Sequence, residues 1–140
     1  MAKIWTKKLS VGNATLDSEN KNLIGMVNSI EYAVEIKDCS YLLLSIKQFM
    51  KCALAHFANE ERFAQAVNFP FAQHELAHRH LQNELQHTKD QLEANNSMWP
   101  EYVMDHYPQF LRDWLTEHIT MEDMLMKPML QAYPYDFKPG

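Results

Sequence analysis

Glycine is scarce in this sequence, with three residues among 140, and β-branched residues occur only in short clusters. Tight hairpin turns depend on glycine and on other residues that accept a positive φ, and strands are rich in valine, isoleucine and threonine. A sheet of several strands is therefore excluded as the basis of the fold. We expect an all-α chain, long enough at 140 residues to bury a core as a single domain.

Cysteine and long apolar runs are also scarce. The two cysteines, Cys39 and Cys52, form no C-x-x-C pattern and each fits a helix as a small hydrophobe, so we expect a reducing, cytoplasmic location. The basic start of the chain is followed by no apolar segment, and no apolar run approaches the roughly 20 residues that cross a bilayer. We expect neither a signal peptide nor a membrane partner. The net charge of −5, with both signs interspersed, argues against nucleic acid as a partner.

Apolar residues recur at helical spacing in three segments of the first 94 residues, separated by breaks around residues 38–40 and 68–70. Asp17 and Ser40 are the expected caps of the first two helices, because a side-chain oxygen there can accept from the free backbone amides. The expected spans are about 17–37, 40–66 and 71–94.

A fourth helix is expected to present an apolar face that includes Leu111, Leu115, His118 and Leu125. Pro108 marks its start or a kink, and residues 98–107 are expected to be irregular or to lead into it. Residues 1–15 are expected to form an extended arm. Residues 132–140 form a tail whose aromatic side chains pack on the outside, so the bundle itself covers about 16–131 of a single domain, 1–140.

Each apolar stripe becomes polar near one end of its helix. The polar positions are Asn20 in the first helix, His56 and Glu60 in the second, His74 and His78 in the third, and His118 in the fourth. Short connections favour an antiparallel up-down-up-down four-helix bundle, which brings these six positions to one end of the core. Four imidazoles and a carboxylate in a dry interior suit a transition metal, iron or zinc first.

The segment from His74 to His78 also matches H-E-x-x-H, the zinc-protease motif in which Glu75 would be the general base. On a helix, however, Glu75 lies about 100° from His74 and points away from the stripe that carries the histidines. A metal clamp that faces the core is therefore the favoured interpretation, and a protease is the weaker alternative.

Five elements along the chain together resemble the hemerythrin family, in its bacterial single-domain form. They are Trp5 with Leu9-Ser10-Val11-Gly12, Leu16-Asp17, His56-x-x-x-Glu60, His74-x-x-x-His78, and Trp114-Leu115-x-x-His118-x-x-x-x-Asp123. The resemblance implies a non-haem centre of two iron ions. It places His74, His78 and His118 on one iron and His56 on the other, with Glu60 and Asp123 as bridging carboxylates beside a solvent-derived oxygen.

The chain departs from the family pattern at one position. The family motif in the first helix has the form I-D-x-Q-H, whereas residues 16–20 read Leu-Asp-Ser-Glu-Asn, so that Asn20 stands where the histidine ligand is expected. An amide oxygen is a poor iron ligand compared with imidazole, and Glu19 is the nearest alternative donor. Helical spacing alone would also favour Glu122 over Asp123, because Asp123 is rotated by about 140° from His118.

The resemblance implies reversible binding of dioxygen or another small diatomic molecule, for storage, transport or sensing, more than an enzyme. Leu115 matches an apolar residue over the gas pocket in the family, and it is equally a normal core residue. A second hypothesis is a di-iron oxidase, or an enzyme that reacts with peroxide or nitric oxide, because a missing imidazole leaves an exchangeable position on the second iron. A third is a degenerate module that holds one metal or none and acts by binding an undefined protein partner.

Overall fold

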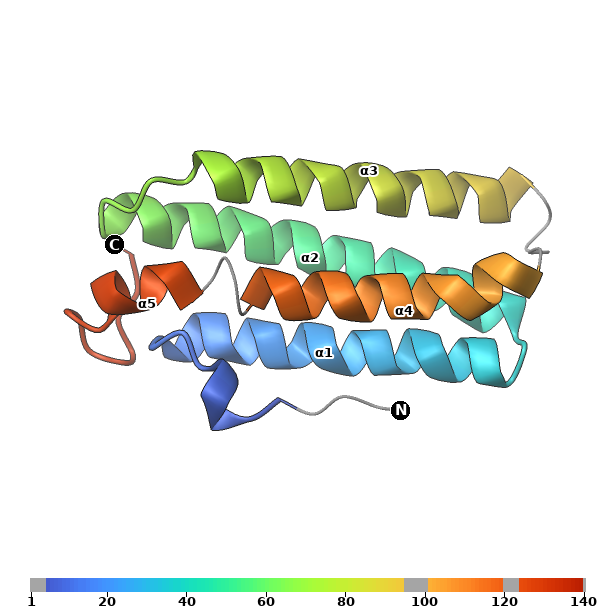
Figure 1. Cartoon of the computed structure of the whole chain (residues 1–140), viewed down its shortest axis with the longest axis horizontal. Helices are drawn as coiled ribbons and strands as arrows, with labels where there is room; N and C mark the ends of the chain where they lie inside the picture. The colour runs from blue at the N-terminus through green and yellow to red at the C-terminus, as the bar shows by residue number, and fades with distance from the viewer. Residues whose placement is uncertain (1–4, 95–100, 120–123, 140) are drawn as a thin grey trace.

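The computed structural model describes residues 5–94, 101–119 and 124–139, and for residues 91, 92 and 101–108 it describes the backbone alone. Four long helices, α1 (Ala14–Glu35), α2 (Cys39–Ala66), α3 (Ala72–Ala94) and α4 (Glu101–Glu117), are followed by the short α5 (Met124–Leu130). Successive long helices run in opposite directions, and α1 lies beside both α2 and α4 (Figure 1). The predicted all-α, up-down-up-down bundle is confirmed.

The helix caps differ from the prediction at both positions. Asn13 caps α1, because its side-chain oxygen accepts from the amides of Thr15 and Leu16 at 3.0 and 3.2 Å, and Asp38 caps α2. Asp17 and Ser40 were therefore wrong as caps. Asp17 lies inside the first turn of α1, where its carboxylate accepts hydrogen bonds from other segments of the chain.

The stripes predicted from periodicity form most of the core. In α2 the stripe of helical period is buried throughout, at Leu42, Ile46, Phe49, Ala53, His56, Glu60 and Phe63. In α1 the stripe is buried at Leu16, Asn20, Leu23, Val27 and Ile30 and only partly buried at Val34, and Ile24 and Ala33 are buried in addition. Leu125 was wrongly placed on the apolar face of the fourth helix and is 57% exposed, because the chain continues there as the separate helix α5. Residues 101–107 are helical rather than irregular, and Pro108 lies within α4; residues 98–100 are outside the described part.

The arm and the tail meet at the start of α1. The arm contains a short 3₁₀ helix, η1 (Lys7–Leu9), and packs Trp5 and Leu9 against the main core. The Asp17 carboxylate accepts from Ser10 Oγ and the Val11 amide on the arm, and from the Tyr135 hydroxyl on the tail at 2.8 Å. One buried carboxylate therefore joins three segments that are distant in the sequence.

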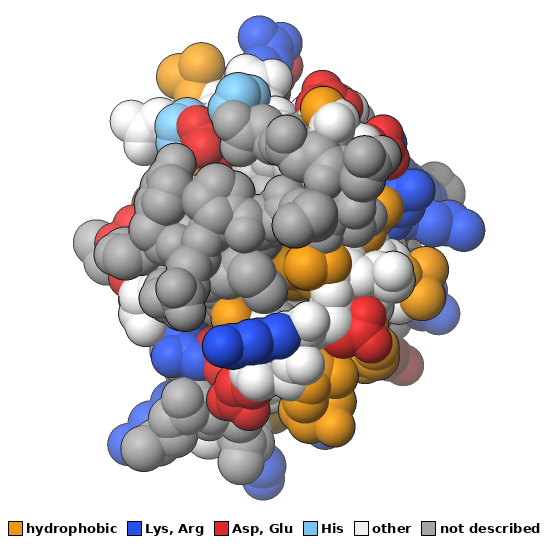
Figure 2. All heavy atoms as spheres, turned by 90° about the vertical axis from the view of Figure 1, so that its right-hand side faces the viewer, with side chains coloured by type: hydrophobic (Ala, Val, Ile, Leu, Met, Phe, Trp, Pro, Cys, Tyr) orange, Lys and Arg blue, Asp and Glu red, His pale blue; other side chains and the backbone are white. Residues whose placement is uncertain are grey.

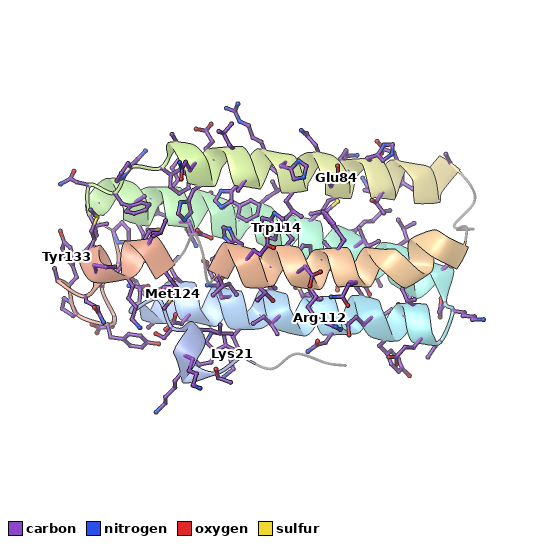
Figure 3. The ribbon with its side chains drawn as sticks, viewed as in Figure 1. Lys21, Glu84, Arg112, Trp114, Met124 and Tyr133 are labelled. Atoms are coloured by element: carbon purple, nitrogen blue, oxygen red, sulfur yellow. The ribbon has the colours of Figure 1, made fainter. Side chains whose placement is uncertain are left out.

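A second, smaller core lies at the same end of the bundle. It joins the arm, α1, the end of α2 and α5 through Val11, Leu16, Phe63, Ala64, Val67, Met126 and Leu130. The tail continues this contact, because the ring of Phe137 meets that of Phe63 with centroids 6.1 Å apart. The expected packing of tail aromatics on the outside of the bundle is confirmed, with Tyr133 at the outer edge of the tail (Figure 3).

The opposite end of the bundle has a mixed surface. Figure 2 shows charged side chains of both signs interspersed with hydrophobic ones, and histidines among the exposed groups. His80 and His87 are both exposed, in agreement with their positions off the apolar stripe. Across the part of the chain that the structure describes, no helix has the length and apolar character needed to cross a membrane.

Candidate metal centre

Five predicted site residues come together at the end of the bundle that the second core closes. They are His56 and Glu60 near the end of α2, His74 and His78 in the first two turns of α3, and His118 directly after α4. Each has an exposed fraction of 4% or less. The antiparallel order of the helices places these residues together, because the ends of α2 and α4 lie beside the start of α3 (Figure 1).

Glu60 is at the centre of this group. Its Oε1 lies 2.9 Å from Nε2 of His118 and is also in contact with Nε2 of His56, while its Oε2 lies 3.9 Å from Nε2 of His78. One donor atom from each of His56, Glu60 and His118 lies within 4.8 Å of the other two. The ring centroids of His74 and His78 lie 6.0 and 5.0 Å from that of His118. Three imidazoles therefore face one carboxylate, and the fourth, His74, lies beside the rings of His78 and His118.

Two groups of this site have the protonation states that a metal requires. Burial tends to raise the pKa of Glu60, but the facing imidazoles of His56 and His118 outweigh it and hold that pKa well below its usual range. Burial lowers the pKa of His78 to about 3, and the Glu60 charge opposes this only in part. At neutral pH the carboxylate is charged and His78 is neutral, with a lone pair free to coordinate.

Two buried atoms of the site lack a hydrogen-bond partner within the described part of the chain: Nε2 of His78 and Oε2 of Glu60. Both belong to a nitrogen-and-oxygen donor set that suits iron or zinc. Buried polar atoms left without a partner cost stability, and a bound cation would satisfy both of them. The residues present therefore fit a metal ion.

Aromatic rings fix the imidazoles in place. Phe57 stacks on His78 with centroids 3.7 Å apart, Trp114 stacks on His118 at 4.7 Å, and Phe71 stacks on His74 at 5.3 Å. Trp114 projects from α4 toward the interior of the bundle (Figure 3). Sequence reasoning did not assign a role to Phe57 or Phe71, although Phe71 stands three residues before His74 on the same stripe.

Glu19 is a further residue of the site, and its contact with His56 was not predicted from the sequence. Its Oε1 lies 2.7 Å from Nδ1 of His56, and its Oε2 accepts from the side-chain amide of Asn59 at 2.5 Å. A neutral His56 that donates from Nδ1 to Glu19 has the lone pair of its Nε2 free to coordinate a cation. This hydrogen bond is a second reason why the site fits a metal.

The model of the hemerythrin HHE cation-binding domain matches residues 11–130. The chain belongs to the hemerythrin family. It is similar to the bacteriohemerythrin of Pseudomonas aeruginosa, with 24% identity over 121 residues that cover 86% of this chain and 76% of that protein. The bacteriohemerythrin of Stenotrophomonas maltophilia is 22% identical over 135 residues, covering 96% of this chain and 85% of the relative. A hemerythrin-like protein of Naegleria gruberi is 24% identical over 126 residues, covering 90% and 92%.

Solved structures show the same fold. A crystal structure of a wild-type hemerythrin matches with a TM-score of 0.82 at 23% identity, covering 94% of this chain and 100% of the other. Membership of the hemerythrin family implies binding of non-haem iron and of dioxygen. The His and Glu cluster of this chain lies where a bundle can hold such a centre, in the core between facing helices.

In this hemerythrin, Asn20 is fully buried on α1, one residue after Glu19. The predicted odd polar position in the core stripe is confirmed by this burial. The neighbouring Glu19 contacts His56, so the structure gives Glu19 a role as the hydrogen-bond partner of a histidine.

The two candidate carboxylates after α4, Glu122 and Asp123, lie outside the described residues. His118 and Ile119 form a π-type turn, whose hydrogen bonds join residues five apart. Glu75 is exposed and paired with Arg79 at 2.6 Å on the outside of α3, which removes the basis of the zinc-protease alternative.

Proposed function

We propose that this hemerythrin binds dioxygen reversibly at a centre of two iron ions in the bundle core. In this proposal His74, His78 and His118 would hold one iron, His56 would hold the other, and Glu60 and Asp123 would be carboxylate ligands shared by both. When bound, the iron pair would supply the electrons for dioxygen binding. The observation that carries the proposal is the cluster of four buried imidazoles, three of which face the charged carboxylate of Glu60.

The surrounding residues exclude water from the site. His56 and His118 are 1% and 2% exposed, and aromatic rings cover the other faces of the imidazoles. Leu115, one turn before His118 on α4, is buried and presents an apolar side chain. A dry, apolar surround disfavours loss of a charged product to solvent, which supports storage of dioxygen over turnover.

Glu19 is proposed as the residue that orients His56. A carboxylate on the outer nitrogen of an imidazole fixes the ring and makes its other nitrogen a better donor. This effect is most useful at the second iron, where Asn20 replaces an imidazole. We infer that the second iron is held by fewer strong ligands than the first and is the more exchangeable of the two.

The test is the iron content and visible spectrum of the protein loaded with ferrous iron under anaerobic conditions. We expect about two irons per chain and a spectrum that changes with air and reverts under vacuum. Steady consumption of oxygen with a reductant would favour the oxidase alternative, and one iron or none would favour the degenerate module.

Two histidines on α3 provide a matched pair of variants. His74→Ala removes a proposed ligand and should abolish the three-histidine iron, whereas His80→Ala changes an exposed residue on the same helix and should leave iron content unchanged. Equal iron content in the two variants would refute the assignment of His74.

A further inference from the structure

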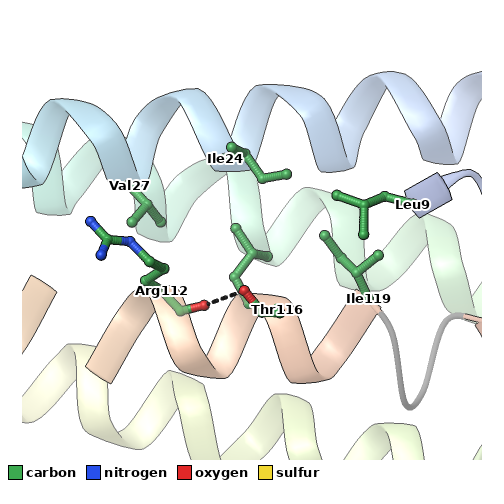
Figure 4. A pocket seen from close by; sticks show the side chains of 7 residues that line it. Leu9, Ile24, Val27, Arg112, Thr116 and Ile119 are labelled. Carbon is green, nitrogen blue, oxygen red and sulfur yellow. Dashed lines mark hydrogen bonds between the residues drawn. The ribbon is translucent and has the colours of Figure 1, made fainter. Parts of the chain in front are cut away.

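A small cavity lies between α1 and α4, beneath the N-terminal arm (Figure 4). The centre of a water-sized sphere can occupy a volume of about 10 Å³ inside it. This volume is close to the lower limit for one water-sized molecule. Two helices and the arm contribute to its wall, which consists of Leu9, Ile24, Val27, Arg112, Leu115, Thr116 and Ile119.

Most of the polar groups in this wall already have partners within the protein, and the exception is the buried Nε of Arg112, which has no hydrogen-bond partner among the described residues. The hydroxyl of Thr116 donates to the backbone oxygen of Arg112 at 2.8 Å, and the guanidinium of Arg112 pairs with the carboxylate of Glu31. Figure 4 shows this guanidinium at the Val27 end of the group, away from Leu9. Apart from this one N–H group, what remains for a guest is the surface of aliphatic side chains and of the Arg112 stem.

Water is a poor guest for such a cavity, because a buried water needs two to four polar partners. Apolar cavities instead stay dry and accept apolar guests such as xenon. A dissolved diatomic gas is uncharged, apolar and about the size of one water molecule. By contrast, the larger hollow between α2 and α3, about 240 Å³, is lined partly by the amides of Gln82, Asn83 and Gln86 and suits solvent.

The cavity also lies beside the candidate metal centre. Leu115 and Ile119, which form part of its wall, stand three residues before and one residue after His118. Leu115 is therefore shared between the cavity and the surround of the proposed iron site. Leu9, from the arm, is only partly buried, as are Arg112 and Thr116 in the same wall.

We propose that this cavity is a docking site for an apolar diatomic gas, dioxygen above all, on its route between solvent and the metal centre. The proposal rests on the proposed function for the identity of the gas. The seam between α1 and α4 under Leu9 is the outer end of the route, and Leu115 is its inner end.

A docking site on the route has a kinetic signature. A side chain that fills the docking site slows arrival and escape of the gas by the same factor. It does so because it changes the free energy of neither the gas-free protein nor the gas-bound state at the metal. The association and dissociation rate constants should therefore fall together, while the dissociation constant and visible spectrum stay the same. A distortion of the metal centre would instead change the dissociation constant or the spectrum.

The test compares two additions of one methyl group to the same helix. Val27→Ile places the methyl in the cavity wall, and Val34→Ile makes the same change at a partly buried position of α1 that is not in the wall. Xenon is the probe, measured by ¹²⁹Xe NMR on metal-free protein, and stopped-flow measurements give the dioxygen rate constants of iron-loaded protein. Urea unfolding verifies that both variants fold.

We expect wild-type protein and Val34→Ile to bind xenon and Val27→Ile to lose it. Val27→Ile should also lower both rate constants several-fold at an unchanged dissociation constant. Absence of xenon binding in the wild type, equal effects of the two substitutions, or unchanged rates in a Val27→Ile variant that has lost xenon would each overturn the proposal. If the iron-loaded wild type binds no dioxygen, the proposed function fails, and the xenon signal of metal-free protein still decides whether the cavity accepts an apolar gas. Leu9→Ala provides a second variant and should raise both rates.

Discussion

Replacing Glu60 by glutamine removes the charge from the centre of the site and keeps the shape of the side chain. In the wild type, Glu60 Oε1 contacts Nε2 of both His56 and His118, and these imidazoles hold the pKa of the carboxyl well below its usual range. A hydrogen bond to a charged group contributes about 1.5–3 kcal/mol, and glutamine can retain one neutral contact. We therefore expect metal-free Glu60→Gln to lose about 2 kcal/mol of its free energy of unfolding.

The loss of the charge should affect iron more strongly than it affects folding. Glu60 is the proposed bridge between the two irons, and a neutral amide is a weaker ligand for iron than a carboxylate. We expect Glu60→Gln to retain one iron per chain or none, with the weakly ligated second iron lost first.

The assay combines iron content after anaerobic loading and gel filtration with urea unfolding of the metal-free protein. Glu75→Gln is the control, because Glu75 is an exposed side chain of α3 that pairs with the exposed Arg79. That variant should keep its iron and change stability by less than about 0.5 kcal/mol. A Glu60→Gln variant with the iron content and stability of the wild type would refute the central role of Glu60.

Three further predictions concern other parts of the molecule. Asn20→His should increase retention of the second iron and slow autoxidation; if iron content and autoxidation are both unchanged, Asn20 does not govern the second site. The pKa of His78 is about 3 in the folded protein and 6.5 ordinarily, so as pH falls the His78 imidazole takes up a proton in the unfolded chain first. Metal-free protein should therefore lose stability as pH falls from about 6.5 toward 3. The loss from His78 should be about 3 kcal/mol by pH 4, and a flat urea midpoint over this range would contradict it. Tyr135→Phe removes the hydroxyl that donates to Asp17, and should lower the melting temperature through a loss of about 1 kcal/mol; an unchanged melting temperature would show that this hydrogen bond does not hold the tail.

The sequence alone was sufficient to predict the helical bundle and the meeting of the four histidines at one end of it. A stripe of period 3.6 determines which face of a helix is buried, and short connections determine that neighbouring helices run antiparallel. Together these two rules place His56, His74, His78 and His118 at one end before any distance is known. The burial of Asn20 follows from the same rules, because it lies on the stripe between Leu16 and Leu23.

Tertiary structure decided the features that depend on which groups meet across the chain. Asp17 and Asn13 are both good caps by residue type, and Asn13 takes that role because the arm and Tyr135 bind the Asp17 carboxylate. Glu19 lies off the core stripe, and only the packing of α1 against α2 brings it to His56.

The cavity beneath Leu9 depends equally on tertiary structure, because its wall joins residues more than 100 positions apart in the sequence. The division of the predicted fourth helix into α4 and α5 also follows from the fold, with a π-type turn at His118 and Ile119. Periodicity describes one helix at a time. Caps, hydrogen bonds between helices and cavities depend on side chains from different elements, and their positions are determined only when the helices pack together.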